Sequence, residues 1–160
     1  MMNDSLKKQV GRAAVVSAIA LVAGCSTMQG WMHRTPEESP TRPSGYMQSV
    51  TLTGANEVPA VSTSATGSGT VTVNPDHTVV ANITVTGMQA TASHIHMGAA
   101  GANGPVIVPF TKTGDNKFSA PAGAKLTDEQ YAAFKAGNTY VNVHSDAHKG
   151  GEIRAQLKGS

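Results

Sequence analysis

The chain has 160 residues, with 12 lysines and arginines against 10 aspartates and glutamates, and a single cysteine. Residues 1–24 carry three of the basic residues and one of the acidic ones, so the remainder has nine of each sign. A balanced remainder argues against a nucleic-acid partner or an acidic substrate. One cysteine cannot form an internal disulfide, so the folded part must be held by its apolar core or by a metal.

The first 24 residues have the layout of an export signal. Lys7, Lys8 and Arg12 precede an apolar stretch, Ala13–Ala23, that is too short to span a bilayer. Together with Cys25, the segment resembles a bacterial lipoprotein signal, which implies cleavage before Cys25 and lipid modification of that cysteine. The alternative is an ordinary signal peptide, or an anchor helix, with an incidental cysteine.

The same resemblance implies a location. Ser26 after the cysteine favours the outer membrane, so we expect a lipid-anchored protein of the bacterial cell envelope, facing the periplasm or the cell surface. Residues 25–45 are interpreted as a flexible tether because prolines and glycines interrupt them without apolar periodicity. We therefore divide the chain into a signal (1–24), a tether (25–45) and one folded domain (46–160).

From Tyr46 onward the pattern is typical of short β-strands. Apolar and polar residues alternate around Val50, Val71 and Ile83, and Gly, Asn, Asp or Pro follows each run. Further runs surround His94, Ile107, Phe118 and His144, and a last one covers residues 152–158. Roughly seven to nine strands predict an all-β domain, an antiparallel Greek-key sandwich or barrel of the superoxide-dismutase-like or immunoglobulin-like kind.

One short helix is expected near residues 127–136. Thr127 and Gln130 match a capping box, in which the N-cap and the third helical residue bind each other's backbone N–H groups. Gly137 suits the C-terminal end. Tyr131 and Phe134 are interpreted as anchors that pack this helix inward, not as binding residues.

Histidines on two predicted strands form the main candidate site. Alternate residues of a strand share a face, so His94 and His96 point together while Ile95 points into the core. In the later strand the valines take the core face, which leaves Asn142 and His144 together on the other. We expect both sets on polar outer faces of the sheet. If the two strands are close in space, three imidazoles can hold a metal.

Three neutral imidazoles suit copper, zinc or nickel and leave one coordination position open. Copper is favoured over zinc, because no nearby acid stands out as the base that zinc hydrolysis would need. Metal-bound imidazoles donate their other N–H to neighbouring groups, for which Asn142 and Asp146 are candidates, and His148 is a candidate ligand or supporting residue. The alternative is that hydrogen bonds alone hold these histidines.

Five segments, in order, resemble the chordin-type (CHRD) domain. They are Leu52–Pro59, Ser93–Gly98, Asn103–Val106, Tyr140–His144 and Gly150–Leu157, and the resemblance runs from about Met47 to Lys158. The family was named from an extracellular animal regulator of growth-factor signalling and also occurs in bacterial exported proteins. The resemblance therefore implies a fold and an exported location more firmly than an activity.

A second resemblance is to copper–zinc superoxide dismutases, which place a His-x-His on one strand of a Greek-key barrel and a Val-His later. It implies His94, His96 and His144 as copper ligands, superoxide as the small anion, and Arg154 as the arginine that guides it. The chain lacks the bridging histidine, the zinc-site cluster and the disulfide of that family. The favoured alternative is a surface Arg154 paired with a carboxylate.

Two classes of function follow. The first is an exported copper-binding protein that holds copper or has superoxide-dismutase-like redox activity, and whether it is an enzyme is left open. The second is a non-catalytic cell-envelope module whose histidines bind no metal and whose protein partner is unknown. No Ser/His/Asp arrangement, phosphate loop or carboxylate pair of recognisable spacing supports another enzyme class.

Overall fold

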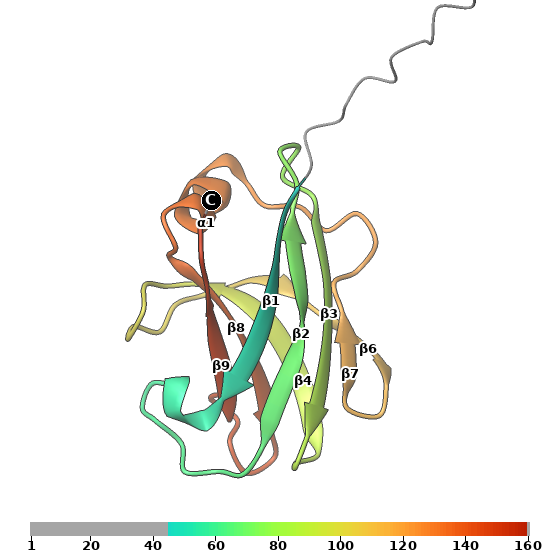
Figure 1. The fold of residues 1–160 in the computed structure, drawn as a ribbon, viewed down its shortest axis with the longest axis vertical. Coiled ribbons are helices and arrows are strands. Elements are labelled where there is room, and N and C mark those ends of the chain that lie inside the picture. The colour runs from blue at the N-terminus through green and yellow to red at the C-terminus, as the bar shows by residue number, and fades with distance from the viewer. Residues whose placement is uncertain (1–44, 160) are drawn as a thin grey trace, which may run out of the picture. The chain divides into compact units, whose positions relative to one another are not determined.

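The computed structural model describes residues 45–159. They form nine antiparallel strands, one α-helix (α1, Asp128–Lys135) and one short 3-10 turn (η1, Gly54–Asn56). Figure 1 shows how these elements are arranged. The strands are β1 (Tyr46–Thr53), β2 (Thr66–Val73), β3 (Val79–Thr86), β4 (Ala90–Met97), β5 (Val106–Pro109), β6 (Thr111–Gly114), β7 (Lys117–Ser119), β8 (Thr139–Ser145) and β9 (Ile153–Leu157). The predicted signal, Cys25 and the tether up to residue 44 lie outside the described residues.

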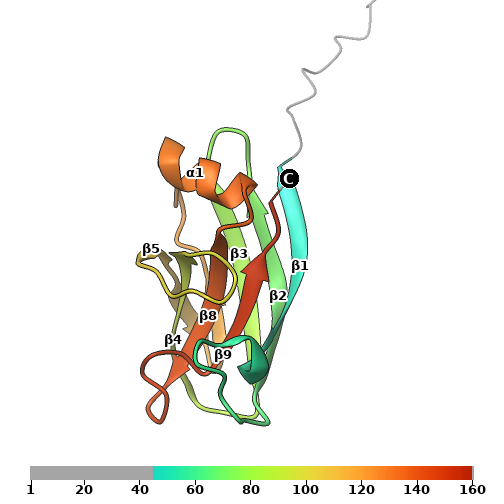
Figure 2. The ribbon, with the colours of Figure 1, turned by 90° about the vertical axis from the view of Figure 1, so that its left-hand side faces the viewer.

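One sheet contains all nine of these strands, in the order β5-β4-β8-β9-β1-β2-β3-β7-β6. Figures 1 and 2 show it folded over, so that the part with β4, β8 and β9 faces the part with β1, β2 and β3. The core lies between them, where Ile153 of β9 packs over Gly67 of β2. The two ends of the sheet also approach each other, because Lys112 Nζ of the edge strand β6 donates to the Ala90 carbonyl of β4 (3.1 Å). This nearly closed arrangement confirms the all-β, antiparallel sandwich or barrel.

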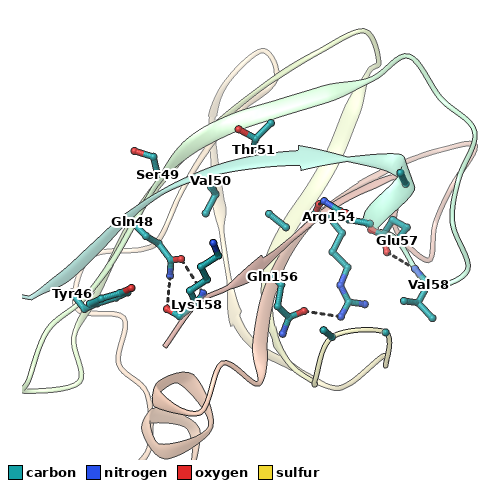
Figure 3. A pocket seen from close by; sticks show the side chains of 15 residues that line it. Tyr46, Gln48, Ser49, Val50, Thr51, Glu57, Val58, Arg154, Gln156 and Lys158 are labelled. Atoms are coloured by element: carbon teal, nitrogen blue, oxygen red, sulfur yellow. Dashed lines mark hydrogen bonds between the residues drawn. The ribbon is translucent and has the colours of Figure 1, made fainter. Parts of the chain in front are cut away.

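The two parts of the sheet meet at a narrow seam. Strand β1 pairs with β2 along its whole length but with β9 only at Thr53, opposite Arg154. Farther along the seam, the side chain of Gln48 replaces backbone pairing. Its amide donates to the Lys158 carbonyl (3.3 Å) and accepts from the Lys158 N–H (3.0 Å), as Figure 3 shows. Between these two links the seam has no other backbone pair.

Alternation decides which face each strand buries. In β3, Val79, Ala81, Ile83 and Val85 are buried and the residues between them are exposed. In the turn that joins β2 to β3, His77 has a positive φ of 68°. Its ring stacks on Tyr131 of α1, with ring centroids 4.1 Å apart.

Helix α1 has the predicted capping box. Thr127 Oγ1 accepts from the Gln130 N–H (3.2 Å), and Gln130 Oε1 accepts from the Thr127 N–H (2.9 Å). Phe134 is buried in the core, and Gly137 follows the helix with a φ of 74°. The helix near 127–136 is therefore confirmed. Within residues 45–159, no helix is long and apolar enough to cross a membrane.

Candidate metal centre

Strands β4 and β8 are hydrogen-bonded neighbours, and their pairing brings the three histidines together. In the ladder His94 lies opposite Asn142, and His96 lies opposite Tyr140. Side chains of opposed residues point to the same side of a sheet, so His94, His96 and His144 project from one face. One nitrogen from each ring lies within 4.8 Å of the others. The two strands that carry the histidines are therefore close in space, as a metal site at these residues requires.

This polar, non-core face of the sheet is largely covered. Asn142 has only 1% of its surface exposed and His96 has 8%. The loop of residues 98–105 reaches His96 through the Gly104 carbonyl, and Gly151 lies against the Asn142 amide. The histidines lie on the non-core face of the sheet, as alternation predicted, and loops between strands fold back over this face.

Backbone carbonyls determine which nitrogen carries the proton in two of the rings. Nδ1 of His96 lies 2.9 Å from the Gly104 carbonyl oxygen, and Nδ1 of His144 lies 2.9 Å from that of Lys149. A carbonyl only accepts, so both Nδ1 atoms carry hydrogen and both Nε2 atoms of the neutral rings present a lone pair. Within the described residues, Nε2 of His96 is buried and has no hydrogen-bond partner. Such an atom is unusual unless something else binds it.

His94 and His144 already interact directly. Nδ1 of His94 lies 3.0 Å from Nε2 of His144. Because Nε2 of His144 presents its lone pair, Nδ1 of His94 donates the hydrogen in this bond. If that hydrogen moved to Nε2 of His94, the lone pairs of both nitrogens would be directed toward the same region.

Burial keeps two of the rings, His94 and His96, uncharged. Burial, followed by the neighbouring His144 and His96, lowers the pKa of His94 to about 4. Burial also lowers the pKa of His96, although the hydrogen bond to Gly104 opposes this change. Both rings are therefore neutral at pH 7, and neutral imidazole is the form that binds a metal.

The other candidate residues are distributed around the cluster. Asn142 lies at the cluster itself, opposite His94. Asp146 is exposed in the turn between β8 and β9. His148 is half-buried in the same turn, where its N–H donates to Ser145 Oγ (3.2 Å). The group of close ligand nitrogens consists of His94, His96 and His144 without His148.

Arg154 lies on the histidine face, opposite Asn142 in the β8–β9 ladder. It is only 1% exposed, so the surface position that both predicted roles assumed is wrong. Its guanidinium carbon lies 3.3 Å from the centre of the Tyr140 ring, and Nη2 donates to the Ala102 carbonyl (2.9 Å). In Figure 3 the side chain extends from β9 beside a groove of about 620 Å³ and bonds to Gln156. Arg154 therefore binds a neighbouring loop and does not face solvent.

Glu57 is a residue of this region that sequence reasoning missed. It is 6% exposed, and its Oε1, which lies near Gly151 and the Asn142 amide, has no hydrogen-bond partner within the described part of the chain. Burial raises the pKa of its carboxyl. Glutamates beside short turns are usually exposed, so the only signal for Glu57 was its place in the Leu52–Pro59 segment.

Comparison with known proteins gives a family match. Residues 48–157 match the family described as the CHRD domain. No curated protein and no solved structure matches the chain. The matched range includes the three histidines, Glu57 and Arg154. The predicted CHRD resemblance is confirmed, whereas nothing in the comparisons supports the resemblance to superoxide dismutases.

Proposed function

The chain belongs to the CHRD-domain family, and we propose that it is an exported, lipid-anchored protein that binds copper through His94, His96 and His144. The observation that carries the metal proposal is Nε2 of His96. This atom is buried, has no partner in residues 45–159, and carries a lone pair because Nδ1 is held by Gly104. His96 belongs to the group of three histidines with ligand nitrogens within 4.8 Å of one another, and the other two rings are already in contact.

The spacing of the donors suits one metal ion. Nitrogens bound to one ion at about 2.0–2.1 Å are at most roughly 4.2 Å apart. All three candidate nitrogens lie within 4.8 Å of one another. Rotation of the imidazole rings would have to close a difference of at least about 0.6 Å for the most distant pair.

Copper is favoured by the donor set. Three neutral imidazoles are good ligands for copper and leave a position for a small ligand, and no carboxylate belongs to the group. Bound copper would supply one-electron redox chemistry, while the three histidines hold it and leave a position for a small anion such as superoxide.

Metal loading of the full chain tests the proposal. We expect one copper per wild-type chain, with nitrogen ligands in the electron paramagnetic resonance spectrum, and loss of this copper in His94→Ala/His144→Ala. The matched control is His148→Ala, a nearby histidine outside the cluster, which should bind copper like the wild type. If the double variant binds copper as tightly as the wild type, the proposal fails and a non-catalytic envelope module is the remaining function.

A second measurement separates redox activity from copper holding. Superoxide decay should be faster with the copper-loaded chain than with the copper-free chain if the site is a dismutase. If copper binds and the decay rate is unchanged, the function is to hold copper. Zinc-loaded protein is the control, because zinc has no redox chemistry.

The proposed anchor is supported by the order of basic, apolar and small residues before Cys25. Labelling with radioactive palmitate should mark the wild-type protein and leave Cys25→Ala unmarked. Equal labelling of both would reject the lipid anchor without bearing on the metal site.

A further inference from the structure

Arg154 is a buried cation that is bound mainly by oxygens of one loop. Nη2 donates to the carbonyls of Ala102 (2.9 Å) and Ala99 (3.3 Å), and Nη1 donates to the side chain of Asn103 (3.2 Å). Among the described residues, no carboxylate lies within 4.0 Å of its guanidinium. A guanidinium has five N–H donors in a fixed plane, so one arginine can bind several acceptors of a loop at once. Arg154 of β9 therefore holds the loop of residues 98–105 through these hydrogen bonds.

The next residue of this loop contacts the metal centre directly. The Gly104 N–H donates to the Tyr140 hydroxyl (3.2 Å), and the Gly104 carbonyl accepts from Nδ1 of His96 (2.9 Å). A side chain at position 104 would overlap the carbonyl oxygen of Met97. The loop backbone thus packs against β4 and sets the proton on His96.

A second path joins Arg154 to the same imidazole. The Tyr140 ring stacks on the His96 ring, with centroids 4.8 Å apart and planes 7° apart. The guanidinium of Arg154 lies 3.3 Å from the centre of the same tyrosine ring. Since β4 and β9 flank β8 on opposite sides, His96 and Arg154 cover opposite faces of Tyr140. Arg154 is therefore connected to His96 in two ways, through the stacked Tyr140 ring and through the loop of residues 98–105.

We infer that Arg154 is a positioning residue for the metal centre: through the loop of residues 98–105 and the Tyr140 ring, it fixes the orientation of His96 and keeps the hydrogen on Nδ1. Nε2 is thereby held as the ligand atom. This role rests on the proposed function, but it concerns the metal-free protein as well. It replaces a role for Arg154 in attracting an anion from solvent.

The first test is the tautomer of His96 in the metal-free full chain, measured by nitrogen-15 NMR of the imidazoles. The wild type should show hydrogen on Nδ1. Arg154→Met removes the donors and should give a mixture of tautomers or hydrogen on Nε2. Arg154→Lys keeps the charge without the planar set of donors and should restore the wild-type tautomer only in part. Copper affinity should fall about tenfold or more in Arg154→Met, as for other residues that support metal ligands.

Two further variants keep the test decisive. Asn103→Ala removes one acceptor from the exposed side of the loop and should shift the tautomer in the same direction, even if Arg154→Met does not fold. Lys158→Met, an exposed cation on the chain just after β9, is the matched control and should change neither tautomer nor affinity. If Arg154→Lys and Asn103→Ala both retain the wild-type tautomer and copper affinity, the inference is overturned while copper binding stands. If the wild type binds no copper, the proposed function fails, and the NMR result alone decides whether Arg154 positions His96.

Discussion

Nδ1 of His94 lies 3.0 Å from Nε2 of His144, although fifty positions separate the two residues in the sequence. Neighbouring strands β4 and β8 hold both residues, so the backbone ladder sets this separation and no loop has to close around an ion. Two of the three donors are therefore in place before a metal arrives. Entry of a metal would require the hydrogen of His94 to move from Nδ1 to Nε2, with no net loss of a proton, but little movement of the chain.

Acid is expected to destabilise the metal-free protein through His94. Its pKa is about 4 in the folded chain, against an ordinary value of 6.5. The unfolded chain takes up the proton first, so stability that is present above pH 6.5 is lost as the pH falls toward 4. Denaturant titrations across this range should show a fall in the free energy of unfolding that is shallower in His94→Gln. Equal slopes would contradict a buried, neutral His94.

The contribution of Glu57 to stability should change with pH in the sense opposite to that of His94. Burial raises the pKa of its carboxyl, so its contribution to stability is present below the ordinary value of 4.5 and is lost as the pH rises through the raised value. At pH 7 the ionised group is unfavourable in the folded chain. Glu57→Gln is therefore expected to raise the free energy of unfolding at pH 7, measured by chemical denaturation. A decrease at pH 7 would show that the ionised carboxylate stabilises the fold.

Glu152 is the contrasting buried carboxylate. Burial opposes its ionisation, but hydrogen bonds from Ser145 and Thr63 outweigh this effect and lower its pKa. Its contribution is thus present above pH 4.5 and is lost on acidification. Glu152→Gln should lower the free energy of unfolding at pH 7 by about 1–3 kcal/mol. The exposed Asp146→Asn is the control, and a similar small change in both variants would contradict the prediction.

Replacement of Gly104 tests how closely the loop packs on β4. A methyl group there would overlap the Met97 carbonyl, so Gly104→Ala must displace the loop. We expect a loss of about 1–3 kcal/mol in the free energy of unfolding. Weaker copper binding should accompany it, because His96 loses its acceptor. Gly150→Ala is the matched control, since nothing lies near the added methyl group. Equal thermal stability of the two variants would count against this packing.

The strands with clear alternation were the predictable part of the fold. Around Val71 and Ile83, apolar residues at every second position meet one core, and turn residues end each run. Strand β6 was not predicted, because all four of its residues, Thr111–Gly114, are exposed. It forms only by pairing with the edge strand β7, and that pairing leaves no pattern in its own sequence.

For the candidate site, alternation correctly placed His94 and His96 on one face, and the structure adds that β4 and β8 are adjacent. What covers that face could not be predicted from the sequence. Burial of Arg154 and Glu57 depends on loops that come from distant parts of the chain, the segments around Ala102 and Gly151. A charged residue on a strand gives no local sign of whether a loop will fold over it.

The narrow seam between β1 and β9 has a consequence for how this sheet comes apart. With one backbone pair at Thr53 and the Gln48 side chain as the second link, the seam has few hydrogen bonds to break, so we expect sub-global opening to begin there. Amide protons along the facing edges of these strands should then exchange faster than those of the β4–β8 ladder. Strands β4 and β8, which carry the three histidines, both lie on the β9 side of this seam. The three histidines are therefore expected to stay assembled while β1, β2 and β3 open away from them.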